Sequence, residues 1–159
     1  MAYRQLYERY EQPFLRTACR MLGRQQEAEE AVQETFLKLH RGIHHYKGGS
    51  RFSTYFFRIL INTCTDILRQ RDPEFGEDLE KAGMAFQPSI DLRQSLEKAI
   101  ASLPAQARVC FILFAVEELS QTEISQILGI RVGTVKSTLH RARANLRKQL
   151  SVSLKGETA

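Results

Sequence analysis

Apolar residues recur at helical spacing along three segments in the first part of the chain. Steps of three and four residues place such side chains on one face of a helix. We expect helices over about Ala2 to Leu22, Gln26 to Ile43 and Phe52 to Arg71. The stripe of the first consists of Leu6, Tyr10, Phe14, Ala18 and Leu22, and that of the second of Ala28, Val32, Phe36, Leu39 and Ile43. The paired glycines 48 and 49 predict a loop before the third helix.

The last part of the chain predicts a second group of helices. Its first apolar stripe consists of Leu92, Leu96, Ala99, Ile100 and Leu103. Pro104 suits the first turn of the next helix, which is strongly apolar from Val109 to Val116. Two further helices are expected over about Gln121–Leu128 and Val132–Leu150. No segment alternates strictly between apolar and polar residues, so the fold is expected to be all-α.

The stretch between the two groups has a different character. Residues 73–89 carry two prolines and two glycines among scattered acids, with no clean periodicity. Such a composition is typical of a connector. We therefore expect two small helical domains, residues 1–72 and 91–159, joined by a flexible acidic linker over residues 73–90. In a chain of 159 residues, neither domain would be robustly stable alone.

Charge is unevenly distributed along the chain. The formal net charge is +5, and residues 131–150 contain six basic side chains and no acidic one. A basic stripe of this kind indicates a polyanionic partner such as a nucleic acid. The alternative is an ordinary solvated helix face.

The cysteines and the hydropathy exclude several classes of protein. Cys19, Cys64 and Cys110 are isolated, which favours small buried side chains over a disulfide or a zinc site. No apolar run approaches the length of a membrane span, and the basic N-terminus lacks the apolar core of a signal peptide. We therefore expect a cytoplasmic protein without membrane insertion.

Residues 119–137 have the character of a helix-turn-helix. Ser120 is a good helix N-cap, and Glu123 lies three residues further on, as a capping box requires. Ile124 and Ile127 are expected to bury the first helix against the second, and Gly129 supplies the turn between them. An ordinary helical hairpin is the alternative.

The second helix of this motif separates an apolar face from a basic one. Val135, Leu139, Ala142, Leu146 and Leu150 fall at core spacing. Short polar and long cationic side chains near the start of such a helix can reach base edges in the major groove, and cations further along can anchor phosphates. The candidate DNA-binding residues are Arg131, Lys136, Ser137, His140, Arg141, Arg143 and Arg147.

Three segments together resemble one known family. Residues 118–143 look like region 4 of the extracytoplasmic-function (ECF) sigma factors, bacterial proteins that direct RNA polymerase to promoters. Residues 27–38 resemble the polymerase-docking helix of that family, and residues 52–62 resemble the helix that opens and reads the −10 element. The resemblance implies that the first domain docks on core polymerase and traps the −10 strand. It also implies that the second domain binds the −35 element and that the linker runs toward the RNA exit path.

For the docking helix, the resemblance implies contact with the largest-subunit coiled coil of core polymerase, and region 4 is expected near the flap region. The candidate polymerase-binding residues are Glu30, Gln33, Glu34, Leu37 and Lys38. From the residues alone, a solvated acidic face is the alternative. The family also implies an anti-sigma factor as a partner, although no residue here identifies it.

The loop before the third helix and the helix itself carry residues suited to an opened strand. A base pulled from a duplex needs an aromatic or polar pocket, and an exposed strand needs stacking surfaces and cations. The candidate −10 residues are His45, Tyr46, Lys47, Ser50, Arg51, Tyr55, Arg58 and Asn62. The family often has tryptophan at Tyr55, arginine at Thr138 and proline at Arg131. These departures leave the expected fold intact, and the sequence does not determine the promoter preference.

Two other functions would use parts of this sequence. A stand-alone DNA-binding regulator would use the same helix-turn-helix but would leave the acidic helix and the aromatic loop unexplained. A metal protein could use His40 and His44, which are four residues apart, with His45 beside them. The chain lacks a general-base glutamate between paired histidines, so we expect no metal, no cofactor and no catalytic residues.

Overall fold

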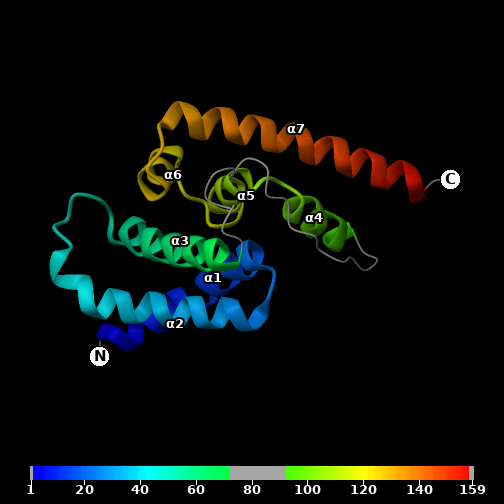
Figure 1. The fold of residues 1–159 in the computed structure, drawn as a ribbon. Coiled ribbons are helices and arrows are strands. Elements are labelled where there is room, and N and C mark those ends of the chain that lie inside the picture. Colours follow the sequence, from blue (N-terminus) through cyan, green and yellow to red (C-terminus); the bar gives the residue numbers. More distant parts are fainter. Residues whose placement is uncertain (1, 72–91, 158–159) are drawn as a thin grey trace.

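The computed structural model describes residues 2–71 and 92–157, and in this part of the chain the regular secondary structure is all helical (Figure 1). The first half contains α1 (Ala2–Leu22), α2 (Gln25–Gly42), the short 3-10 helix η1 (Ile43–His45) and α3 (Phe52–Arg71). The second half contains α4 (Leu92–Ala101), α5 (Ala105–Phe111), the π-helical turn η3 (Ile112–Val116), α6 (Gln121–Leu128) and α7 (Val132–Glu157). The all-α prediction with two helical domains is confirmed.

The helix boundaries follow the sequence pattern closely. The predicted limits of the first, third and sixth helices are those observed, and α2 begins and ends one residue early. Pro13 lies inside α1 without splitting it, and the last helix continues beyond Leu150 to Glu157. The predicted linker over residues 73–90 lies outside the described residues.

An aromatic cluster holds the first half together. Phe14 of α1 is fully buried, and its ring centroid lies 4.5 Å from that of Phe56 and 4.8 Å from that of Phe57, both on α3. Phe36 of α2 closes the cluster with its ring 5.1 Å from Phe56. Edge-to-face pairs of this kind add stabilisation beyond the area that they bury. The cluster therefore fixes α1, α2 and α3 relative to one another.

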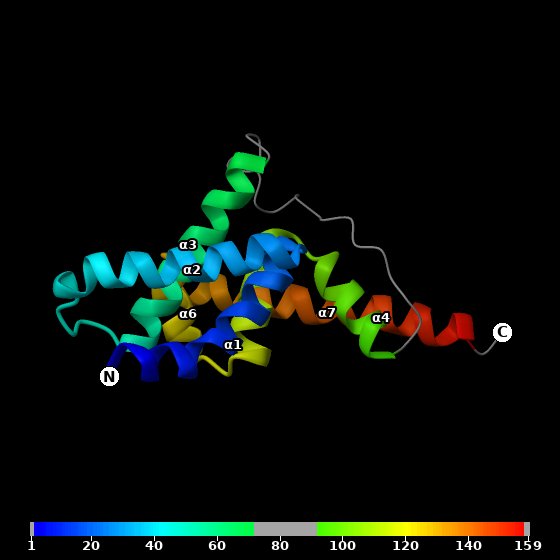
Figure 2. The ribbon, with the colours of Figure 1, turned by 90° about the horizontal axis from the view of Figure 1, so that it is seen from below.

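The two halves share a hydrophobic core. One cluster of buried residues joins Leu60 and Ile61 of α3 with Val109 of α5 and Ile127 of α6. The contacts between α3 and α6 are among the most extensive between any two helices of the described chain, and the two helices lie side by side in both ribbon views (Figures 1 and 2). A smaller cluster packs α4 against α7 through Ile100, Leu103 and Leu146. The helix-turn-helix is thus seated directly on the first half.

Polar contacts reinforce this seam. Arg16 of α1 donates two hydrogen bonds to the carboxylate of Glu117, at 2.8 and 3.0 Å. Thr17 donates a third to the same group at 3.1 Å. Arg20 binds Glu97 of α4 through two nitrogens, at 3.2 and 2.9 Å. These bidentate pairs set the direction in which the two halves face each other.

The cysteines are packing residues, as expected. Cys64 and Cys110 are buried, and Cys19 is partly buried; all three are free thiols. Burial raises the pKa of both Cys64 and Cys110 to about 12, so these thiols stay protonated at neutral pH. Within residues 2–71 and 92–157, we find no helix with the length and apolar content that crossing a membrane requires.

The aromatic cluster generates a stability prediction. We expect Phe14→Ala to lower the free energy of unfolding by about 3–5 kcal/mol, because it removes a buried ring and leaves a cavity. Val152→Ala, at a side chain that is 67% exposed, should change it by less than about 0.5 kcal/mol. Urea unfolding followed by circular dichroism measures both. A Phe14→Ala loss no larger than that of Val152→Ala would contradict the role given to the cluster.

Candidate nucleic-acid interface

The helix-turn-helix has the local geometry that its sequence predicts. The hydroxyl of Ser120 accepts a hydrogen bond from the backbone N–H of Glu123 at 3.1 Å and so caps α6. Gly129 ends the helix with a φ of 67°, a left-handed conformation that glycine adopts without strain. The Ser125 hydroxyl donates to the carbonyl of Ile130 at 2.7 Å across the turn. The turn therefore fixes the orientation of α7 relative to α6.

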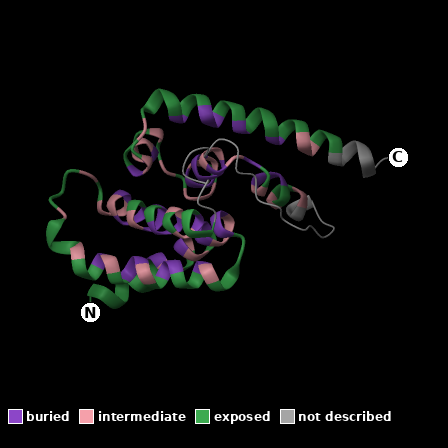
Figure 3. Ribbon diagram, viewed as in Figure 1, coloured by how far each residue is buried: buried purple, intermediate pink, exposed green. Residues whose placement is uncertain are grey.

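One face of α7 is buried and the other is open (Figure 3). Val135, Leu139 and Ala142 are buried, as predicted. All seven candidate −35 residues are exposed, from Arg131 to Arg147. The guanidinium of Arg143 lies 4.9 Å from the centroid of the Phe114 ring, a cation–π distance that orients it. The start of α7 thus offers the polar and cationic surface that a major-groove reader needs.

Thr138 does not belong to that exposed surface. Its side chain is buried on the core side of α7, where it lines a pocket with Leu103 and Ala142. An arginine at this position would have to reach out past neighbouring residues. The departure from the family pattern at Thr138 therefore changes packing under the reading face.

Six of the eight candidate −10 residues line one shallow pocket of about 390 Å³. They are His45, Tyr46, Lys47, Ser50, Tyr55 and Arg58. The rings of Tyr46 and Tyr55 lie 5.0 Å apart at 35°, and the Tyr55 hydroxyl donates to the carbonyl of Gly42 at 3.2 Å. Tyr46 also donates from its hydroxyl to the carbonyl of Ser50, which closes the loop. Aromatic walls beside cationic side chains suit an unstacked base and its phosphate.

The helix-turn-helix forms one wall of this pocket. Gln126 of α6 lines it, and Arg58 donates a hydrogen bond to the Gln126 carbonyl. One turn earlier on α3, Thr54 donates to the Glu123 carboxylate at 3.5 Å. Arg51, which lies outside the pocket, is 4.0 Å from the same carboxylate. The surface of α3 that is predicted to read the −10 strand is therefore partly covered by α6.

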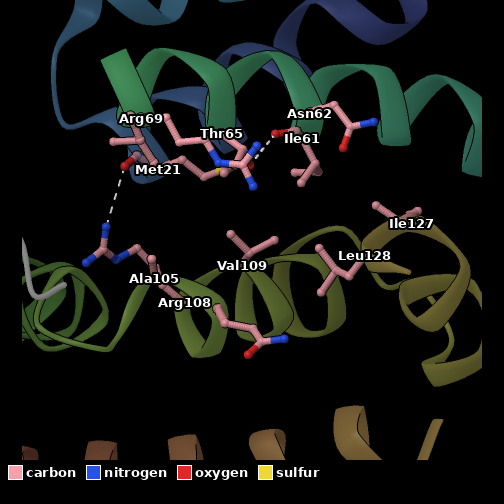
Figure 4. Close-up of a pocket in the computed structure, with 12 residues that line it drawn as sticks. Met21, Ile61, Asn62, Thr65, Arg69, Ala105, Arg108, Val109, Ile127 and Leu128 are labelled. Carbon is pink, nitrogen blue, oxygen red and sulfur yellow. Dashed lines mark hydrogen bonds between the residues drawn. The ribbon is translucent and has the colours of Figure 1, made fainter. Parts of the chain in front are cut away.

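Asn62 lies away from the other −10 candidates. Its side chain lines a separate pocket of about 160 Å³ between α3 and α5, together with Val109 and Leu128 (Figure 4). Asn62 shares a helix face with Arg58 and is likewise exposed, but it lies one turn further along α3, at a pocket that α5 and α6 also line.

The candidate docking surface on α2 is mostly open. Glu30, Gln33 and Leu37 are exposed, and the apolar Leu37 side chain is 48% exposed. Glu34 and Lys38 are half-buried, and the Lys38 ammonium donates to the Thr63 hydroxyl at 3.1 Å. Lys38 therefore links α2 to α3 in addition to any contact it makes with a partner.

Two tyrosines extend the exposed surface beside α2 and were missed by sequence reasoning. Tyr3 and Tyr7 of α1 are 42% and 41% exposed, and the Tyr7 ring lies 5.0 Å from that of Phe36. The Tyr3 hydroxyl donates to the Phe36 carbonyl at 2.7 Å. Their spacing of four residues on an exposed helix face was the available signal. Gln126 and Glu123 were also missed, because nothing local in the sequence places them beside α3.

The histidines make ring contacts. His40 packs edge-on against Tyr3 at 5.7 Å, and the rings of His44 and His45 lie 4.1 Å apart. Among the residues that the structure describes, histidine, cysteine and carboxylate side chains nowhere gather in groups of three. The metal-protein alternative thus lacks a ligand set in this part of the chain.

Comparison with known proteins gives matches in both halves. Residues 6–74 match the family model for Sigma-70 region 2, and residues 93–146 match the model for Sigma-70 region 4. The chain is 34% identical to the ECF RNA polymerase sigma factor SigW of Bacillus subtilis, over 94% of this chain and 89% of that protein. It is 30% identical to the RNA polymerase sigma-H factor of Pseudomonas aeruginosa, over 97% and 89% of the two chains.

A solved structure has the same architecture. The sigma factor RpoE in its complex with the anti-sigma factor NepR, from Bartonella quintana, superposes with a TM-score of 0.77 at 27% identity, covering 95% of this chain and 98% of that one. Two family models in the expected order, with relatives matched over nearly their full length, agree with the geometry of both halves. The chain belongs to the ECF family of RNA polymerase sigma factors.

Proposed function

We propose that this chain binds core RNA polymerase and directs it to promoters, reading the −35 element with α7 and the −10 strand with the loop and first turns of α3. The observation that carries the proposal is the pocket of six candidate −10 residues, which occurs in the same chain as an exposed basic recognition helix. The exposed face of α2 would dock on the largest-subunit coiled coil of polymerase, with region 4 near the flap region. The chain would act in the cytoplasm and catalyse no reaction itself, because the polymerase performs the chemistry.

Promoter binding requires the two halves to separate. Elements centred about 25 base pairs apart lie roughly 85 Å apart along B-form DNA. α7, the longest helix described, has 26 residues and therefore spans only about 39 Å. The closed arrangement, in which α6 packs on α3, cannot reach both elements at once. Docking on polymerase would supply the free energy that opens it.

An anti-sigma factor fits this closed arrangement as a partner. The sigma factor RpoE, which has the same fold, was solved in complex with the anti-sigma factor NepR. CnrH, which also shares the fold, was solved in complex with the cytosolic domain of CnrY. A protein that binds both halves while α3 and α6 are in contact would hold this chain closed. It would thereby keep the −10 pocket covered.

In vitro transcription tests the proposal directly. Purified chain and bacterial core polymerase are combined on the DNA upstream of the chain's own gene. A discrete transcript that requires both components is the expected result. Sequence-specific binding by the chain alone, with no transcript, would instead support a stand-alone regulator.

Arg141→Ala tests the reading of the −35 element. We expect it to weaken promoter binding by the holoenzyme by about 1–3 kcal/mol and to relax specificity at one base pair. Arg147→Ala is the matched control, because a phosphate anchor should weaken binding evenly across promoter sequences. Affinities for a panel of single-base promoter variants give the answer. Equal sequence profiles for the two variants would contradict base reading by Arg141.

Glu30→Arg tests the docking surface. Reversing this exposed charge should weaken core polymerase binding at least tenfold, which corresponds to about 1.4 kcal/mol. Glu29→Arg carries the same charge change one position away, on a different face of α2, and should have a smaller effect. Fluorescence anisotropy with labelled chain and core polymerase measures both. Equal losses would mean that the net charge of α2, rather than a defined surface, controls docking.

Glu117→Lys tests the closed arrangement. A lysine there would face Arg16 and Thr17 instead of accepting their hydrogen bonds, and the like charges should open the seam. Since Arg58 would then no longer be bound to the Gln126 carbonyl of α6, we expect binding of a single-stranded −10 oligonucleotide to tighten by about threefold or more. Glu118→Lys is the control, with the same charge change at an exposed neighbour. If both variants bind the oligonucleotide as the parent does, α6 is no barrier to the −10 surface.

A further inference from the structure

A buried arginine, Arg108, and a half-buried one, Arg20, line a cleft at the seam between the halves. The cleft has a volume of about 380 Å³ and is lined by the ends of α1 and α3 on one side and by α4 and α5 on the other. We call it the seam cleft. It lies apart from the −10 pocket and from the exposed face of α7, and no function described above uses it.

Arg108 is the more unusual of the two. It is only 2% exposed, and it reaches from α5 toward α1, where Nη1 donates to the Met21 carbonyl at 3.5 Å (Figure 4). Nη2 donates to the carbonyls of Ala101 and Leu103 at 2.7 and 2.8 Å. Nε is buried and has no hydrogen-bond partner among the described residues. No carboxylate in the described chain forms an ion pair with this guanidinium, and burial lowers its pKa.

Arg20 offers a second unused donor. Its Nε and Nη2 bind Glu97, but Nη1 is buried without a partner in the part of the chain that the structure describes. A buried N–H group without an acceptor is costly, and more so on a charged group. Both arginines thus line the same cleft, from opposite halves of the molecule, and each has one buried N–H group without an acceptor among the described residues.

The charge of the seam cleft is positive. Four arginines line it, at positions 20, 24, 71 and 108, and Glu97 is the acid in the lining. Glu27 pairs with both Arg24 and Arg71 from beside the cleft. Among the described residues in and beside the cleft, arginines thus outnumber carboxylates, which favours an anionic ligand.

We propose that the seam cleft binds a small oxyanion of the phosphate type, either free phosphate or the phosphate group of a nucleotide. One N–H group of each guanidinium is available to an oxyanion, and charge-assisted hydrogen bonds of this kind are strong. Phosphate oxygens would accept from Nε of Arg108 and Nη1 of Arg20. The volume falls in the range of small-molecule sites, and Leu22, Ile100 and Ala101 form an apolar wall for the uncharged part of an ester.

Anion binding would be linked to closure of the seam. Arg20 and Leu22 come from the first half, whereas Ala101 and Arg108 come from the second, so the site exists only while the halves are packed together. A ligand that binds one conformation stabilises that conformation. The anion would therefore keep α6 over the −10 surface. This last consequence rests on the proposed function, but binding itself does not.

Thermal unfolding of the full chain with inorganic phosphate, at ionic strength matched with chloride, tests the site. At phosphate concentrations a hundred times the Kd, we expect Tm to rise by about 5–10 °C. Hydrogen exchange should slow at the end of α1 and in α4 and α5. The same measurement is repeated with adenosine monophosphate. A larger rise in Tm than with phosphate would show that the apolar wall contacts the nucleoside part of the ligand. An equal rise would show that the site recognises the phosphate group alone.

Arg108→Met and Arg20→Lys should each abolish most of the shift. In Arg108→Met, an apolar chain replaces the buried charge, a change that such sites often tolerate. In Arg20→Lys, the positive charge is kept but the guanidinium N–H groups are lost. Arg4→Met, at an exposed arginine paired with Glu8, should leave the shift unchanged.

Three outcomes would overturn the proposal. The first is no shift beyond the chloride control, and the second is an equal shift in all three variants, which would mean non-specific binding to a basic surface. The third concerns the acids that follow Arg71 along the chain. A shift that appears only after the triple substitution Glu74→Gln, Glu77→Gln and Asp78→Asn would mean that the chain's own carboxylates compete for the cleft.

Discussion

The apolar contact of α3 with α5 and α6 is the constraint on which the rest of the structure depends. Each half is too small to bury a core that would make it robustly stable alone. Ile61 of α3 and Val109 and Ile127 of the second half belong to one buried cluster, so each half completes the other. The same contact holds the helix-turn-helix on the first half, places α6 beside the candidate −10 residues and forms the seam cleft.

The sequence predicts the elements well because their signals are local. The stripe from Leu6 to Leu22 and the cap at Ser120 depend only on neighbouring residues, and both are present in the structure. The seam could not be predicted in the same way. The apolar run from Val109 to Val116 has the pattern of a domain's own core, and periodicity does not say which apolar faces meet. Arg108 likewise has no sequence feature that distinguishes it from a surface arginine.

Some features of the candidate site follow from neighbouring residues, whereas others depend on how the helices pack. Tyr46 and Tyr55 come together because a short loop leads directly into the first turns of α3. Their pocket could therefore be anticipated from adjacent residues. Gln126 as its wall, and Asn62 outside it, depend on how α6 packs across α3. Helical spacing correctly placed Arg58 and Asn62 on one exposed face but could not predict which helix would pack beside it.

The hydrogen bond from Arg58 ends on the backbone carbonyl of Gln126 rather than on a side chain. A backbone acceptor survives nearly every substitution at its own position. The exposed side chains of α7, by contrast, are those that would touch DNA. Descendants of this chain could therefore exchange residues such as Lys136 and Arg141, and so acquire new target sites, while inheriting the same resting conformation. Target choice and self-closure would then evolve as separate traits.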